Sequence, residues 1–186
     1  DAVMLSGETS VGKYPIDSVK IMARIAESTE DHGLPRMAAF KWQPHTHTGI
    51  ICRAAADVAE AAGAETLVAF TTSGDSARRI ARYRSPIPIV AFTPDAIVRN
   101  QLALTWGVQT YLVPAVKHTD AMVKQVDKAL LEIGKLDKGS RVVIVAGAPP
   151  GIPGSTNALR LHSLGAAISA VAPGYLDDLD DEQLLG

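Results

Sequence analysis

Short apolar runs alternate with stretches of helical periodicity through the middle of the chain. The runs are bounded by turn residues and several are rich in Val and Ile, a pattern typical of buried strands. They predict four strands, at residues 66–70, 87–92, 108–113 and 141–146. The helical stretches predict helices that begin near residues 49, 75, 94 and 119. This alternation is typical of an α/β layered domain with a mostly parallel sheet.

A fifth strand is predicted at residues 157–162, where Leu159 and Leu161 occupy alternate positions. The connection that precedes it is too short for a crossover helix, so this strand is expected to return antiparallel to the fourth. Ligands in such sheets bind beyond the carboxyl ends of the strands. The turn after residue 70 and the loop after residue 146 lie at such ends, and we expect them to converge on one site.

Cap residues locate the ends of several predicted helices. Gly63 ends the first helix of the domain and Gly134 ends the last. The Thr93-Pro94 pair predicts a cap followed by the first helical position, and Thr119 predicts the cap of the last helix.

The first 33 residues predict a separate strand–loop–helix unit. Residues 1–5 are apolar enough for a strand, residues 6–9 are expected to form a loop, and Pro15 suits the first turn of a helix. One such unit cannot bury both faces of its strand, so its neighbours are expected upstream. Gly, Pro and polar residues then break all periodicity between 34 and 48, which predicts a linker.

Composition narrows the class of protein. The chain has 186 residues, of which 47% are hydrophobic and 20% charged, and it has one cysteine, Cys52, which excludes an internal disulfide framework. Neither a membrane-spanning run nor a basic patch of the kind that binds nucleic acid is visible. The net charge of -2 is uneven, because the segment 166–186 is acidic and contains neither Lys nor Arg. We expect that segment to be a solvated end.

Thr71-Thr72-Ser73-Gly74-Asp75-Ser76 joins a predicted strand to a predicted helix. Four hydroxyl groups can donate hydrogen bonds to phosphate oxygens, and Gly74 lets the backbone approach a ligand closely. The free N–H groups of a helix start favour an anion as well. The alternative is that Ser73 is only a helix cap and that the loop binds nothing.

Two other residues are predicted to be structural: Cys52 as a small buried side chain, and His162 as a packing or interface residue.

Five short segments match one known family in order and spacing: Met4 to Thr9, Gly12 to Pro15, Thr71 to Ser76, Ala81 to Ile89, and Gly154 to Asn157. Over residues 1–165 the chain resembles the C-terminal part of pyruvate kinase. The resemblance implies that residues 1–33 are the final βα unit of a (β/α)₈ barrel and that 34–48 are a linker. It implies that 49–165 form the five-stranded C-terminal α/β regulatory domain, while 166–186 diverge from the usual family ending.

That resemblance also implies a function. The family transfers a phosphoryl group from phosphoenolpyruvate to ADP with Mg²⁺ and K⁺, and its catalytic and metal-binding residues match nothing in this chain. We therefore expect the chain alone to be inactive, with Ser6 and Glu8 at the border of the barrel active site. The family resemblance assigns an effector phosphate to one loop and a second effector loop to another segment. The residues implied are Thr71, Thr72, Ser73, Gly74 and Ser76 in the first, and Gly151, Gly154, Ser155 and Thr156 in the second.

One departure from the family bears on the ligand. Enzymes that respond to a sugar bisphosphate resemble one another in a Trp and an Arg near the start of the second loop, where this chain has Pro149 and Pro150. We therefore expect a sugar monophosphate or a nucleoside monophosphate as effector. The resemblance further implies a cytoplasmic homotetramer. Two alternatives stay open: an interaction module with an empty loop, and a stand-alone α/β hydrolase such as a phosphatase.

Overall fold

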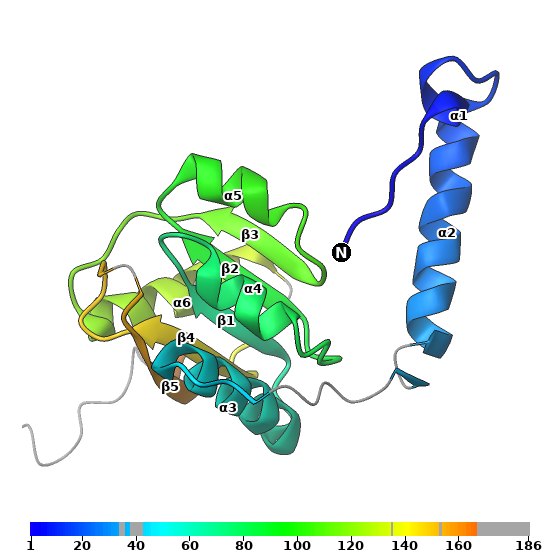
Figure 1. Cartoon of the computed structure of the whole chain (residues 1–186). Helices are drawn as coiled ribbons and strands as arrows, with labels where there is room; N and C mark the ends of the chain where they lie inside the picture. Colours follow the sequence, from blue (N-terminus) through cyan, green and yellow to red (C-terminus); the bar gives the residue numbers. More distant parts are fainter. Residues whose placement is uncertain (34–35, 38–42, 135, 153, 167–186) are drawn as a thin grey trace, which may run out of the picture.

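The computed structural model describes residues 1–33, 36–37, 43–134, 136–152 and 154–166. A five-stranded sheet with the order β3-β2-β1-β4-β5 forms its centre (Figure 1). The strands are β1 (Thr66–Phe70), β2 (Ile89–Thr93), β3 (Val108–Leu112), β4 (Arg141–Gly147) and β5 (Thr156–Ser163). The helices are α1 (Gly7–Ser10), α2 (Pro15–Gly33), α3 (His47–Ala62), α4 (Asp75–Ala81), α5 (Ala96–Leu102) and α6 (Thr119–Ile133).

The direction of the strands agrees with the sequence prediction. β1 pairs in parallel with β2 and β4, and β2 pairs in parallel with β3. β5 pairs antiparallel with β4, as its short connection predicted. The predicted α/β fold with a five-stranded, mostly parallel sheet is therefore confirmed.

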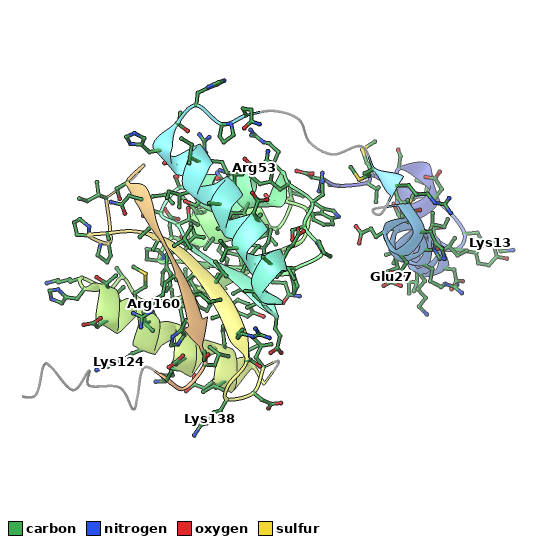
Figure 2. The ribbon with its side chains drawn as sticks, turned by 90° about the horizontal axis from the view of Figure 1, so that it is seen from below. Lys13, Glu27, Arg53, Lys124, Lys138 and Arg160 are labelled. Atoms are coloured by element: carbon green, nitrogen blue, oxygen red, sulfur yellow. The ribbon has the colours of Figure 1, made fainter. Side chains whose placement is uncertain are left out.

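Helices cover both faces of the sheet, with α3 on one side and α6 on the other (Figure 2). Consecutive residues of β1 point to opposite faces: Leu67 packs with α3 and α4, whereas Val68 packs with α6. Both faces of β1, β2 and β4 are buried, which explains why these three parallel strands are apolar runs rather than alternating ones. The largest fully buried side chain is that of Phe92.

Two of the predicted helix ends were correct, and two of the predicted caps were wrong. Gly63 and Gly134 end α3 and α6 in the left-handed conformation that glycine tolerates best. The cap predicted at Thr119 is wrong, because Thr119 is the first residue of α6 and His118 occupies the capping position. The predicted cap at Thr93 is wrong, because Thr93 is the last, fully buried residue of β2. Asp95 caps α5 instead, since its carboxylate accepts hydrogen bonds from the backbone N–H groups of Ile97 and Val98.

The N-terminal segment differs from the prediction. The strand expected at residues 1–5 is wrong, because residues 1–6 have no strand pairing in the described structure, and α1 occupies part of the expected loop. A strand needs a neighbour for its backbone hydrogen bonds, and none is available there. The helix predicted from Pro15 is present as α2, and the described part of this segment contacts the domain through Glu30, whose carboxylate accepts from Trp106 Nε1 at 2.6 Å.

The predicted linker ends earlier than expected. α3 begins at His47, because Thr46 Oγ1 caps it by accepting from Gly49 N at 3.2 Å. Most of 34–42 and the predicted acidic tail from 167 onward lie outside the described residues. Among the described residues, no helix is both long and apolar enough to cross a membrane.

Candidate functional site

Two loops meet at the carboxyl ends of β1 and β4, as the sequence predicted. These strands are parallel neighbours, with Ala69 opposite Val145, so the segments that follow them leave the sheet side by side. We call residues 71–76 the hydroxyl loop and residues 147–156 the second loop. They line one pocket, to which the predicted residues Thr71, Thr72, Ser73, Ser76, Gly151, Gly154, Ser155 and Thr156 contribute.

The hydroxyl loop is a tight turn held by its own side chains. Thr71 Oγ1 accepts from Gly74 N at 2.8 Å, and Ser73 Oγ accepts from Asp75 N at 3.4 Å. Gly74, rather than Ser73, occupies the capping position of α4, with φ of 83°. A side chain there would be strained, which is why the turn needs glycine. Thr72 and Ser73 are exposed, whereas Thr71 and Ser76 are buried.

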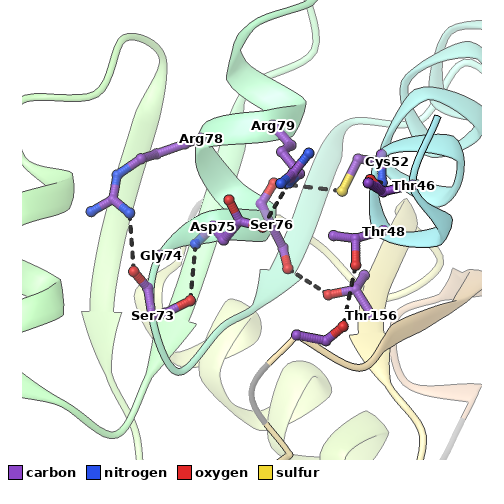
Figure 3. Close-up of polar contacts among 12 residues, drawn as sticks. Thr46, Thr48, Cys52, Ser73, Gly74, Asp75, Ser76, Arg78, Arg79 and Thr156 are labelled. Carbon is purple, nitrogen blue, oxygen red and sulfur yellow. Dashed lines mark hydrogen bonds and ion pairs between the residues drawn. The ribbon is translucent and has the colours of Figure 1, made fainter. Parts of the chain in front are cut away.

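The charged side chains around this loop are held by an ion pair and by a hydrogen bond to the backbone (Figure 3). Of the described residues that line the pocket, Asp75 alone is charged, and its carboxylate accepts from Arg79 Nε at 2.6 Å. That hydrogen bond raises the pKa of Arg79. Arg78 Nη1 donates to Ser73 O at 3.0 Å and so braces the loop backbone. Asp75, which would otherwise repel an anion, is therefore balanced by a cation one helical turn away.

The second loop is closed by a side chain whose role the sequence did not reveal. Asn157 Oδ1 accepts from Ala148 N, and Asn157 Nδ2 donates to Ala148 O, both at 2.8 Å. Gly147 lets the loop turn back on itself, because a Cβ there would lie 2.2 Å from Ser155 Oγ. Thr48, in the predicted linker, donates from Oγ1 to Gly154 O at 3.3 Å.

One buried contact joins the two loops. Ser76 Oγ and Thr156 Oγ1 are 2.7 Å apart, and either atom can donate (Figure 3). Beneath them, the Cys52 thiol donates to Ser76 O at 3.8 Å. Cys52 is fully buried, as predicted, and this burial raises the pKa of its thiol to about 12. The thiol is therefore neutral near pH 7 and is not a nucleophile.

An apolar wall completes the pocket and was missed by the sequence analysis. It comes from Phe70 and from the segments that follow β2 and β3, including Pro94, Val113 and Val116. All these strands are parallel, so their carboxyl ends meet at one edge of the sheet. The prediction of a parallel sheet could have identified this wall, because it places the segments after β1, β2 and β3 at the same edge.

Ser6 and Glu8 lie at α1, outside this pocket. Hydrogen bonds from the backbone N–H groups of Glu8 itself and of Ser6 lower the pKa of the Glu8 carboxyl. Among the described residues, no three side chains of His, Cys, Asp or Glu are grouped so that they could hold a metal ion.

Comparison with known proteins shows which family this chain resembles. Residues 50–162 match the family model described as "Pyruvate kinase, alpha/beta domain". The chain is 51% identical to a pyruvate kinase from Mycobacterium intracellulare over 165 residues, covering 89% of this chain and 35% of that protein. It is 52% identical to one from Corynebacterium efficiens over 165 residues, covering 89% and 34%.

A solved structure agrees in fold. The crystal structure of a pyruvate kinase from Cryptosporidium parvum superposes with a TM-score of 0.74 at 24% identity, covering 87% of this chain and 33% of that one. The present chain therefore spans about a third of the length of the curated relatives it matches.

Proposed function

This chain belongs to the pyruvate kinase family, and we propose that it is the effector-binding and oligomerisation portion of such an enzyme. In this proposal the whole protein is a cytoplasmic homotetramer that converts phosphoenolpyruvate and ADP to pyruvate and ATP with Mg²⁺ and K⁺. The chain by itself does not catalyse that reaction. The described residues offer no cluster of metal ligands, so no step of the proposal is assigned to a metal here.

The convergence of the two loops supports the effector site. The hydroxyl loop contains four hydroxyl groups, and Thr71 Oγ1 already accepts from Gly74 N. Its own proton therefore remains available to a ligand. Ser73 is exposed, and its hydroxyl proton is likewise not used by the bond it accepts from Asp75 N. An anion seated over this turn would receive hydrogen bonds without moving the backbone.

The charge of the pocket supports a ligand with one phosphate. Neither Lys nor Arg is among the described lining residues, and Arg79 is paired with Asp75. The second loop begins with Pro149 and Pro150, which have no side-chain donor. A second phosphate would therefore have to be held without a cation. A sugar monophosphate or a nucleoside monophosphate needs only one such donor set, and its uncharged part would lie along the apolar wall of the same pocket.

Calorimetric titration of the chain with glucose 6-phosphate, ribose 5-phosphate and AMP tests the proposal. Ser73→Ala removes one donor to a charged acceptor, a bond worth roughly 1.5–3 kcal/mol, so the affinity should fall about ten- to a hundredfold. Ser73→Glu should abolish binding, because it places an uncompensated acid over the anion. Both changes are at an exposed position and leave the core intact.

Ser28→Ala is the matched control, because Ser28 is an exposed hydroxyl residue of α2 outside the pocket. It should bind like the unmodified chain. If none of the three ligands binds, the chain is an interaction module with an empty loop. Release of phosphate from any of them would instead favour the hydrolase alternative.

A further inference from the structure

The contact between Ser76 and Thr156 links segments that are 80 residues apart in the sequence. Their hydroxyl oxygens are 2.7 Å apart, and the two residues are only 4% and 7% exposed. Ser76 lies in the hydroxyl loop, whereas Thr156 is the first residue of β5. A hydrogen bond between two hydroxyl groups uses one of their two protons, so its direction decides which proton is left over.

The direction matters for binding an anion. If Ser76 donates to Thr156, the Ser76 oxygen offers a phosphate only lone pairs, which repel it. If Thr156 donates to Ser76, the Ser76 proton is free to donate to the phosphate. A chain of two hydrogen bonds in one direction also polarises both of them, so the second is stronger than it would be alone.

Thr156 is held in place from several sides. Its backbone pairs with Gly147 at the end of β4, and the neighbouring Asn157 clamps Ala148 with two hydrogen bonds. Ser76 is fixed through its carbonyl, which accepts from the Cys52 thiol. Because both backbones are anchored and both side chains are buried, the hydroxyl groups remain in contact while their protons can rotate.

We propose that Thr156 is a positioning residue of the anion site, whose hydroxyl donates to Ser76 Oγ so that the Ser76 proton is directed at a bound phosphate. This inference rests on the proposed function, since it assumes that a phosphate binds at the hydroxyl loop. Ser76 touches the ligand, and Thr156 acts only through Ser76. The second loop thereby contributes to phosphate affinity without contacting the phosphate through this side chain.

A double-mutant cycle tests the inference, using whichever of AMP, glucose 6-phosphate and ribose 5-phosphate binds the unmodified chain most tightly. Thr156→Val keeps the shape of the side chain and removes its hydroxyl. The lost orientation should weaken binding about three- to tenfold, which corresponds to one neutral hydrogen bond. Thr156→Ser keeps the hydroxyl and should restore the affinity to within about twofold. In a Ser76→Ala background, Thr156→Val should have no further effect.

Two results would overturn the inference while leaving the proposed function intact. The first is a Thr156→Val variant that binds as tightly as the unmodified chain. The second is a loss of the same size in the Ser76→Ala background, which would mean that Thr156 supports the pocket by packing alone. Thermal unfolding of each variant confirms that it is folded, and Thr156→Ala, which also lacks the hydroxyl group, replaces the valine variant if that variant does not fold. If the unmodified chain binds none of the three ligands, both the proposed function and this inference fail.

Discussion

The buried pair of Asp127 and His162 provides the most direct test of what holds β5 in place. Asp127 Oδ1 and His162 Nε2 are 2.6 Å apart, and their side chains are 1% and 3% exposed. Asp127 belongs to α6 and His162 to β5, so the pair links the edge strand β5 to helix α6. Replacing Asp127 by Ala leaves a buried imidazole without its partner. Loss of one member of a buried, hydrogen-bonded pair costs about 3–5 kcal/mol.

The expected loss is large compared with the stability of a domain of this size, which is roughly 5–15 kcal/mol. Asp127→Ala should therefore lower the melting temperature by about 10 °C or more in calorimetry. His162→Ala should cost a similar amount, because it leaves the Asp127 carboxylate buried, and Oδ2 of that carboxylate has no hydrogen-bond partner among the described residues. The double variant should cost clearly less than the sum of the two single ones.

Glu132→Ala on the same helix is the matched control. Glu132 forms an exposed pair with Lys128 at 3.9 Å, and such pairs contribute less than about 1 kcal/mol. Urea unfolding of the four variants gives the free energies directly. The reasoning is refuted if Asp127→Ala costs no more than Glu132→Ala, or if the costs of Asp127→Ala and His162→Ala are simply additive.

Three further predictions concern catalysis, assembly and alkaline pH. The purified chain should show no turnover of phosphoenolpyruvate and ADP with Mg²⁺ and K⁺ in a coupled assay, and measurable turnover would contradict the proposed division of roles. The edge strand β5 should mediate self-association, so Leu161→Lys, at a half-exposed position on β5, should reduce the mass seen by light scattering at micromolar concentration, whereas Leu104→Lys, away from β5, should not. Because burial raises the Cys52 pKa from 9.0 to about 12, the folded state disfavours the thiolate, so this contribution to stability is complete below pH 9 and is lost between pH 9 and 12. Over that interval the free energy of unfolding of the unmodified chain should fall by up to about 1.4 kcal/mol per pH unit more than that of Cys52→Ala. Parallel curves of unfolding free energy against pH would contradict this prediction.

Most of the fold could be predicted from sequence because its strongest signals are local. Apolar runs located all five strands of the sheet to within about two residues, and the short connection before β5 fixed its direction. The strand expected at residues 1–5 failed for a non-local reason: an apolar segment becomes a strand only where another strand can pair with it. The cap at Thr93 failed because burial in β2 and the competing carboxylate of Asp95 override a favourable Thr-Pro pair.

The position of the candidate site could be predicted from sequence, but the contacts between its two loops could not. The hydroxyl loop could be identified by its Thr, Ser and Gly residues, and its position at a strand end predicted that it converges with the second loop. The Ser76–Thr156 contact and the clamp formed by Asn157 could not be predicted, because each depends on the register of β4 against β5. A shift of one residue in that register would turn the Thr156 side chain to the other face of the sheet.

The start of α3 explains how both loops are held at once. Thr48 donates to Gly154 O in the second loop, and Cys52, one turn further along the helix, donates to Ser76 O in the hydroxyl loop. These are the same face of one helix, since residues four apart lie above one another. Thr46 fixes where that helix begins, because its hydroxyl caps the first turn. The segment expected to be a linker therefore ends inside the site: a displacement of residues 43–48 would shift the first turn of α3, and with it the carbonyl contacts that hold the two loops together.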